Sequence, residues 1–298
     1  MFYGEGGRWM NENRPSHWRK ISAIAGGLGA AAGFAAFCRW QNSSLSVTTY
    51  RCGSHKLPSS FEDFVLLQVS DLHNKSFGRH QHGLLDRLAA EEPNAILITG
   101  DLVDCHRTNI ARAMEFVRGA VRLAPVYYTP GNHEGRLAVY PRLREELVKA
   151  GVRVLEDQKA CLAYRGGFIE LIGLRDPRFL PPEERKNSQV LEKKLAQLTE
   201  GDEKVFRLLL SHRPELFPIY QKSGVDMVLC GHAHGGQFRL LHQGVFAPGQ
   251  GVLPKYTGGV HVQGATAMVV SRGLGNSEFP LRLNNRPEIV KLILSHEE

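Results

Sequence analysis

Five short polar clusters follow apolar runs along the chain. They read "DLHN" at 71–74, "GDLVD" at 100–104, "GNHE" at 131–134, "SH" at 211–212 and "GHAHGG" at 231–236. Their carboxylates, amide oxygen and imidazoles form a mixed donor set that suits Mn, Fe or Zn better than Ca. The candidate ligands are Asp71, His73, Asp101, Asn132, His212, His232 and His234. Seven donors exceed the need of one ion, and a carboxylate can bridge two, so the set indicates two divalent metal ions.

The elements that must position these clusters alternate between strand and helix. Short continuous apolar runs, typical of strands covered on both faces, occur at 64–70, 95–99, 126–129, 206–211 and 225–230. Amphipathic stretches with helical spacing occur at 82–92, 109–124, 141–151 and 188–201. The alternation predicts an α/β fold, in which the carboxyl ends of the strands bring the clusters to one rim. The part from Phe238 onward, with its Gly and Pro turns, predicts mainly strands.

Each cluster alone is a weak signal. An Asp-x-His after a strand is commonly a helix cap beside a surface histidine, and "GD" is a common turn. The order of all five clusters, each at the end of a predicted strand, is what points to a metal site.

In this order the clusters resemble the calcineurin-like metallophosphoesterase superfamily. The flanking segments resemble its branch of membrane-associated bacterial phosphodiesterases, namely "SFG" at 76–78, "SHRPELF" at 211–217, "GHAHGGQFRL" at 231–240 and "SRGLGNSEFPLRLNNRPEI" at 271–289. The resemblance runs from Phe61 to the end of the chain. It implies a four-layer α-β-β-α sandwich with two central mixed β-sheets and the metal site at one rim.

The resemblance also implies a role for each site residue. Asp71, His73, Asp101 and His234 would hold one metal, and Asp101, Asn132, His212 and His232 the other, so that Asp101 bridges. His133 would protonate the leaving oxygen, and Asp104 would orient His133 through its other ring nitrogen. Two metal ions would activate a hydroxide for in-line attack on a phosphodiester or pyrophosphate, including lipid-linked or envelope substrates. Further candidates for substrate contacts, which turn chemistry explains equally well, are Asn74, Arg175, Arg213 and Gln237.

Two other functions fit the same residues. The rim is generic for P–O cleavage, so a phosphomonoesterase or protein phosphatase is the alternative enzyme. A non-catalytic metal-binding scaffold is the alternative outside enzymes. The sequence contains no GxSxG elbow and no Walker loop, which argues against an acyl hydrolase and an NTP-driven motor.

Charge and cysteine content narrow the class of partner. The 298 residues carry a formal charge of +7, but the basic residues are interspersed with acidic ones, so there is no nucleic-acid-binding signature. A phosphorylated small-molecule or lipid-linked substrate fits the charge better. The five cysteines are scattered singly and indicate neither a zinc knuckle nor a disulfide framework.

The amino terminus predicts attachment to a membrane. A basic segment at 1–20 precedes an uncharged apolar stretch at 21–38, which is the pattern of a transmembrane signal anchor. A cleaved signal peptide, a helix packed on the domain and a flexible leader are the other interpretations. We expect a linker at 39–60 and a metallophosphoesterase domain at 61–298, held at the cell membrane by a single span and extracytoplasmic.

Overall fold

The computed structural model describes residues 17–241, 243–276 and 279–297, and the side chains of helix α1 from residue 20 onward. The chain divides into two compact units, with the boundary between Trp40 and Gln41. Each unit is described by itself.

The first unit consists mainly of one long apolar helix, α1 (His17–Ser43). Its stretch Lys20–Ser43 has a mean hydropathy of 1.7 and is long enough to cross a membrane. The helix therefore extends the span predicted at 21–38 in both directions.

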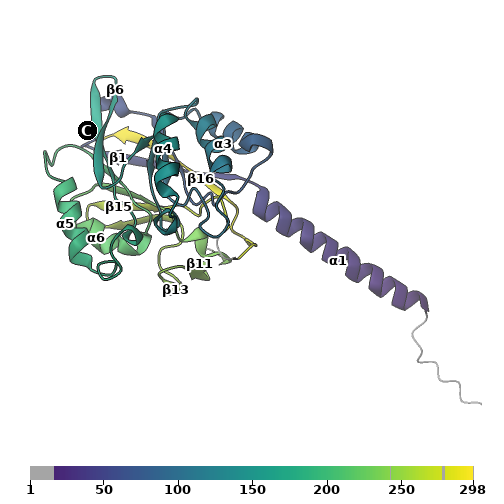
Figure 1. Cartoon of the computed structure of the whole chain (residues 1–298). Helices are drawn as coiled ribbons and strands as arrows, with labels where there is room; N and C mark the ends of the chain where they lie inside the picture. Colours follow the sequence, from purple (N-terminus) through teal and green to yellow (C-terminus); the bar gives the residue numbers. More distant parts are fainter. Residues whose placement is uncertain (1–16, 242, 277–278, 298) are drawn as a thin grey trace, which may run out of the picture. The chain divides into compact units, whose positions relative to one another are not determined.

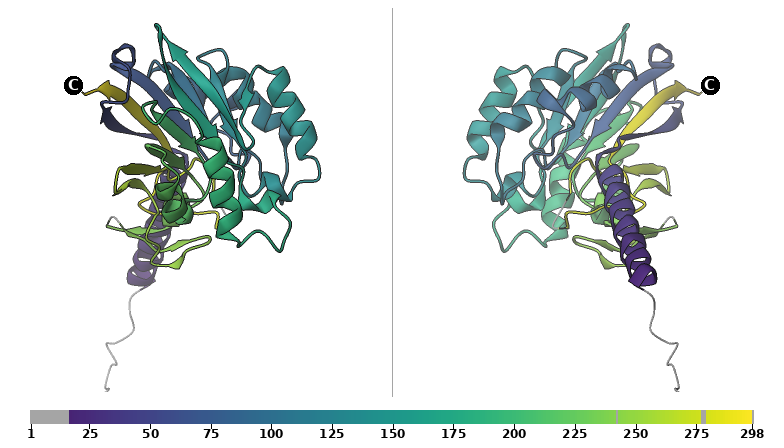
Figure 2. Two further views of the ribbon diagram at one scale, coloured as in Figure 1. Left: turned by 90° about the vertical axis from the view of Figure 1, so that its left-hand side faces the viewer. Right: turned by 90° about the vertical axis from the view of Figure 1, so that its right-hand side faces the viewer.

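The second unit contains two six-stranded mixed sheets lying between helices (Figures 1 and 2). The first sheet has the order β1 (Ser46–Ser54), β16 (Glu288–His296), β2 (Phe64–Val69), β3 (Ala95–Thr99), β4 (Val126–Thr129) and β5 (Arg153–Val154). The second has the order β14 (Gly259–Gln263), β15 (Thr266–Val270), β9 (Met227–Cys230), β8 (Arg207–Leu210), β7 (Gly167–Gly173) and β6 (Gln158–Tyr164).

Parallel pairing runs through the middle of both sheets. Strands β2 to β5 are parallel neighbours, as are β7, β8, β9 and β15, while β16, β6 and β14 introduce the antiparallel pairs. The carboxyl ends of the parallel strands therefore point to one rim in each sheet.

Helices cover the outer face of each sheet and give the four layers. Helices α2 (His82–Ala89), α3 (Ile110–Ala120) and α4 (Tyr140–Lys149) pack their apolar faces on the first sheet. Helices α5 (Ser188–Leu198) and α6 (Phe217–Lys222) pack on the second. A third apolar cluster, which includes Leu97 of the first sheet and Leu229 of the second, fills the space between the sheets. The predicted four-layer fold is confirmed.

Short elements complete the unit. The small strands are β10 (Arg239–Leu240), β11 (Gln243–Gly244), β12 (Phe246–Ala247) and β13 (Gly251–Val252). The short 3-10 helices are η1 (Ser59–Phe61), η2 (Arg79–Gln81), η3 (Glu134–Arg136), η4 (Pro177–Phe179), η5 (Pro214–Leu216) and η6 (His234–Gly236).

The structure corrects the expectation of a linker at 39–60. Residues 46–54 form β1, which pairs in parallel with β16 at the edge of the first sheet. This segment reads "SVTTYRCGS" and is only partly buried. An edge strand needs few apolar residues, so its polar sequence looked like a connector. The hairpin of β6 and β7 was likewise not predicted.

Candidate metal centre

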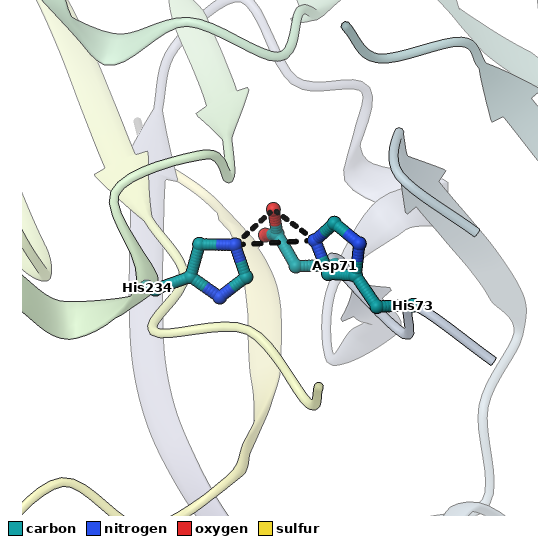
Figure 3. A group of neighbouring side chains, drawn as sticks. All are labelled: Asp71, His73 and His234. Atoms are coloured by element: carbon teal, nitrogen blue, oxygen red, sulfur yellow. Dashed lines mark hydrogen bonds and ion pairs between the residues drawn. The ribbon is translucent and has the colours of Figure 1, made fainter. Parts of the chain in front are cut away.

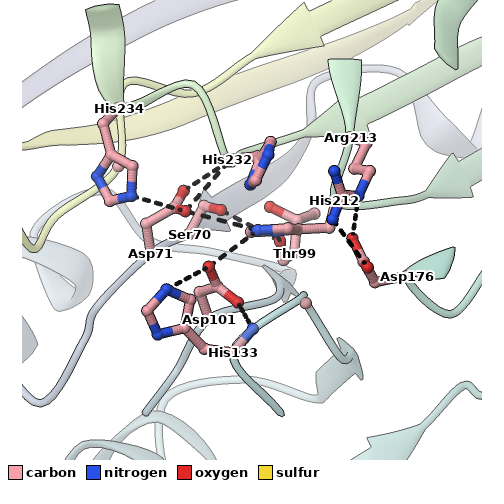
Figure 4. Close-up of polar contacts among 12 residues, drawn as sticks. Ser70, Asp71, Thr99, Asp101, His133, Asp176, His212, Arg213, His232 and His234 are labelled. Atoms are coloured by element: carbon pink, nitrogen blue, oxygen red, sulfur yellow. Dashed lines mark hydrogen bonds and ion pairs between the residues drawn. The ribbon is translucent and has the colours of Figure 1, made fainter. Parts of the chain in front are cut away.

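The candidate ligands lie in the turns that follow five parallel strands of the two sheets (Figure 4). Strands β2, β3 and β4 lead to Asp71 and His73, to Asp101 and to Asn132. Strands β8 and β9 of the other sheet lead to the remaining histidines. Five of the seven ligands have left-handed φ values between 46° and 67°, namely Asp71, His73, Asp101, His232 and His234. Such conformations are strained in non-glycine residues. The tight turns therefore direct the ligand side chains toward the site at the cost of backbone strain.

Asp71, His73 and His234 form the first ligand cluster (Figure 3). The Nε2 atoms of the two histidines are 3.2 Å apart, and Oδ1 of Asp71 is 3.4 Å from Nε2 of His234 and 3.9 Å from Nε2 of His73. All three side chains are buried. One carboxylate oxygen and two imidazole nitrogens therefore lie close enough together to bind the same cation.

Asp101, His212 and His232 form the second ligand cluster. Oδ2 of Asp101 is 3.0 Å from Nε2 of His212, and the rings of His212 and His232 have centroids 4.9 Å apart. The backbone N–H of His232 donates to both carboxylate oxygens of Asp71 at 3.1 Å, which ties this cluster to the first. The "GHAH" turn thus sends His234 to one cluster and His232 to the other.

Asp101 lies between the two clusters. Its Oδ1 accepts a hydrogen bond of 2.8 Å from the backbone N–H of His133. This leaves Oδ2 directed at the centre, 3.0 Å from Nε2 of His212 and 3.6 Å from Nε2 of His73. An oxygen in that position could contact a metal in either cluster.

Buried atoms without partners show that the residues fit a pair of cations. Within the described residues, Oδ1 of Asn132 and Nε2 of His232 are buried and make no hydrogen bond. Such buried acceptors are costly unless an ion or a water molecule satisfies them. His212 is oriented for the task, because its Nδ1 lies 2.8 Å from the carbonyl oxygen of Thr99 and must donate to it. Its Nε2 then faces Oδ2 of Asp101 at 3.0 Å and can bind a metal once it gives up its proton.

Burial and the neighbouring charges shift the pKa values of the ligands in the metal-free protein. Burial, with the neighbouring Asp101 charge, raises the pKa of Asp71 to about 6. Burial lowers the pKa of His73 to about 4. Burial also acts to lower the pKa of His212, but the Asp101 and Asp71 carboxylates outweigh it and raise that pKa to about 10. Without a metal, a proton on His212 balances the carboxylates.

Glu134 supports the ligand turns, a role that sequence reasoning missed. Its buried carboxylate accepts from the N–H of Asp101 at 2.9 Å, of Gly131 at 2.8 Å and of Val103 at 3.2 Å. It thereby clamps the turn after β3 to the turn after β4. The signal in the sequence was its place next to two site residues in "GNHE".

Arg282 lies on the side of the His234 ring that carries Nδ1, and the sequence analysis did not identify it. It is completely buried, donates to the backbone oxygens of Arg272 and Gly275, and places Nη2 3.4 Å from Nδ1 of His234. The signal in the sequence was its place in the flank 271–289.

The structure also differs from the expectation that Asp104 bonds to Nδ1 of His133. Nδ1 of His133 accepts from the backbone N–H of Cys105 at 3.1 Å. Oδ1 of Asp104 instead accepts from the backbone N–H groups of His106 and Arg107 at 2.7 and 3.0 Å. The carboxylate caps its own turn, since an aspartate readily bonds to N–H groups two and three residues on. A neutral His133 then carries its proton on Nε2, which lies 4.0 Å from Oδ2 of Asp101.

The four candidate substrate contacts lie in different surroundings. A cavity of about 200 Å³ opens over the metal ligands and is lined by Arg213, which pairs with Asp176 at 2.6 Å. Asn74 lines a neighbouring cavity of about 580 Å³. Arg175 lines neither cavity and pairs with Asp157 at 2.8 Å. Gln237 is buried, and its amide atoms have no hydrogen-bond partner among the residues that the structure describes.

Comparisons with known proteins agree with this geometry. The family model described as "Calcineurin-like phosphoesterase" matches residues 64–236, more than half of the chain. The chain is 27% identical to "Uncharacterized metallophosphoesterase YkuE" of Bacillus subtilis, over 92% of this chain and 94% of that protein. It is 28% identical to "Phosphodiesterase YaeI" of Escherichia coli, over 94% and 99%. It is 25% identical to "Transmembrane protein with metallophosphoesterase domain" of Bos taurus, over 84% and 57%.

Proposed function

Because the chain belongs to the calcineurin-like phosphoesterase family, we propose that it hydrolyses a phosphodiester or pyrophosphate bond in a lipid-linked or envelope substrate. The family depends on two metal ions, and the two ligand clusters supply side chains for both. The proposal assigns Asp71, His73 and His234 to one ion and Asn132, His212 and His232 to the other. Asp101 serves both.

One observation carries this proposal. Ligand atoms from five turns and both sheets converge on one buried centre, where several of them have no hydrogen-bond partner. Structural polar clusters satisfy their own hydrogen bonds. This cluster leaves acceptors unsatisfied and lies beneath an open cavity. It can therefore bind cations, with a substrate in the cavity above them.

The protein contributes position, charge and a hydrogen-bond donor to the reaction. When bound, two divalent ions supply an activated water and neutralise charge on the phosphoryl group. His133 directs Nε2 toward the centre and is the group that can donate to the leaving oxygen. Arg213 is held by Asp176 and lines the same cavity, so its charge is fixed in place and not left to a mobile side chain.

The surroundings favour a diester over a monoester. A relative of nearly equal length is named a phosphodiesterase. The cavity beside His73 is about 580 Å³ and is lined by the exposed side chains of Arg107 and Arg112. It offers room and positive charge for a second substituent, which a phosphomonoester lacks. The apolar helix α1 supports a substrate at a membrane.

Hydrolysis of two chromogenic substrates tests the proposal. The full chain in detergent, loaded with Mn²⁺, should cleave bis-(p-nitrophenyl) phosphate faster than p-nitrophenyl phosphate and should lose activity in a chelator. Faster turnover of the monoester would overturn the preference for diesters. No turnover of either ester with full metal content would favour a scaffold.

Substitution of His133 tests the mechanism. His133→Ala should slow diester turnover by about 100-fold or more, within the range of general acid catalysis, and leave the metal content unchanged. His55→Ala, on an exposed turn away from both cavities, is the matched control. Unchanged turnover in His133→Ala would remove the role assigned to this residue.

A further inference from the structure

Large apolar side chains gather on two small hairpins of the second unit. Leu241 is 87% exposed, Leu240 and Val252 are each 74% exposed, and Leu253 is 69% exposed. Val245 and Phe246, between them in sequence, are also exposed. We call these six residues, all within fourteen positions, the hairpin surface. An exposed apolar patch of this kind usually marks a site of interaction.

Backbone hydrogen bonds join the two hairpins into one structure. The first consists of β10 and β11, and the second of β12 and β13. The N–H of Leu253 donates to the carbonyl oxygen of Val245 at 2.9 Å, and Val245 donates to Phe238 at 2.9 Å. The exposed Phe279 continues the apolar character, with its ring 6.1 Å from that of Phe238.

The hairpin surface adjoins the metal centre. The turn between β12 and β13 contributes Pro248 and Gly249 to the wall of the cavity over the ligands. Gly236, at the end of the turn that carries His234, has a φ of 76° and approaches Gly244 so closely that a Cβ atom would lie 2.4 Å from its Cα. Whatever covers the hairpins therefore lies beside the mouth of the catalytic cavity.

The chain segment that contains the hairpins carries basic but no acidic residues. Residues 231–277 contain no Asp or Glu, although they contain Arg239, Lys255 and Arg272. Lys255 is exposed and directly follows the second hairpin. Arg272 is paired with Glu288 at 2.7 Å, so Lys255 is the exposed cation of this segment. An apolar surface beside an exposed cation complements an anionic bilayer, in which the side chains enter the headgroup region.

We propose that the hairpin surface docks the catalytic unit on an anionic lipid bilayer, so that a phosphodiester in that bilayer meets the cavity. Three observations select this occupant: the exposed leucine and valine side chains, the acid-free segment around them, and the membrane-length helix in the same chain. The contact with lipid requires no hydrolysis and can be tested alone, whereas the delivery of a phosphodiester to the cavity rests on the proposed function.

Fluorescence of single tryptophans in the full chain tests the contact. The three native tryptophans, Trp9, Trp18 and Trp40, are replaced by Phe, and Val252→Trp reports on the hairpin surface. The protein is reconstituted in vesicles of phosphatidylcholine and phosphatidylglycerol, with or without bromine on the acyl chains. The emission should shift to the blue and be quenched by brominated lipid.

Val148→Trp is the matched control. Val148 is 50% exposed on α4, which packs on the outer face of the first sheet and contributes no residue to the cavity over the ligands. Its emission should not respond to brominated lipid. Equal quenching at both positions, or none at Val252→Trp, would overturn the proposal. A blue shift that grows with protein concentration but is not quenched would assign the surface to a second copy, and would overturn it as well.

Charge substitutions separate the apolar and the electrostatic parts. Adding Leu241→Glu and Leu253→Glu to Val252→Trp should abolish quenching, while hydrolysis of soluble bis-(p-nitrophenyl) phosphate stays unchanged and shows that the unit is folded. Lys255→Glu should reduce quenching only in vesicles that contain phosphatidylglycerol. Quenching that survives the double glutamate variant would refute the hairpin surface as the contact.

Discussion

Glu134 offers the sharpest test of how the metal centre is held. Its carboxylate receives hydrogen bonds from three backbone N–H groups, those of Asp101, Gly131 and Val103. Glu134→Gln keeps the shape but replaces one oxygen with an NH₂ group, which cannot accept. If the amide oxygen takes the position of Oε2, Asp101 and Gly131 keep their acceptor and Val103 loses its own.

The cost of this change follows from the hydrogen bonds. A buried N–H without an acceptor costs about 1–3 kcal/mol, and losing the charge weakens each remaining bond by about 1 kcal/mol. An opposing effect arises because burial raises the pKa of Glu134 to about 7, and a neutral amide avoids burying a charge above that pH. We therefore expect the metal-free protein to lose about 1–3 kcal/mol of unfolding free energy, dominated by the orphaned N–H of Val103.

A second effect separates positioning from simple packing. If Glu134 positions Asp101 for both metals, its replacement should weaken metal affinity by about 10- to 100-fold, as loss of an outer partner does elsewhere. At saturating metal, the stability loss should then exceed the metal-free loss by about 1.4–2.7 kcal/mol.

Thermal unfolding of the full chain in detergent measures both effects, with chelator and with Mn²⁺. Each kcal/mol should lower the Tm by about 2–4 °C in a unit of this size. Glu145→Gln is the control, because Glu145 forms only an exposed pair with Lys149, which contributes little. Equal losses with and without metal would refute the positioning role, and no loss in either condition would refute the hydrogen-bond reasoning.

Three further predictions concern the metals themselves. Asp101→Ala should empty both sites, since Oδ2 faces both clusters; elemental analysis that finds full metal content would contradict the bridging position. His232→Ala and His234→Ala should each weaken a different site, so that titration with Mn²⁺ shows distinct remaining affinities, and identical losses would argue against two separate clusters. Acid should release metal: the metal-free His212 has a raised pKa of about 10, so below that pH metal must displace its proton and affinity should rise by about tenfold per pH unit for each proton released. A flat profile of metal affinity between acid and neutral pH would exclude this competition.

The sequence predicted the parts of the site that depend on chain order. The apolar runs before Asp71, Asp101 and Asn132 became β2, β3 and β4, and parallel strands necessarily bring their carboxyl ends to one rim. Residue type then limited which side chains at that rim could bind a metal. The family shown by the match to residues 64–236 is the one that the motif order indicated.

Features set by tertiary context were not predictable in the same way. The left-handed φ of Asp71 and His73 is disfavoured locally and persists because surrounding packing fixes the turns. The bond from Cys105 to His133 depends on a backbone group, which leaves no trace in residue type. The strand β1 draws its pairing from β16, about 240 residues away. Such partners cannot be read from a single local window.

The division of ligands between the sheets explains how buried carboxylates are tolerated. Asp71 and Asp101 follow strands of the first sheet, whereas His212, His232 and His234 follow strands of the second. Positive charge at the centre, whether a proton on His212 or metal ions, therefore attracts groups from both sheets and holds their rims together. The apolar cluster between the sheets fixes the gap that this charge must fill. A buried side chain, Gln68, sets the same spacing near the rim by donating from Nε2 to Thr99 of one sheet and Cys230 of the other, each at 2.9 Å. The metal centre is thus part of the joint between the sheets, and its loss should loosen the rim before the core.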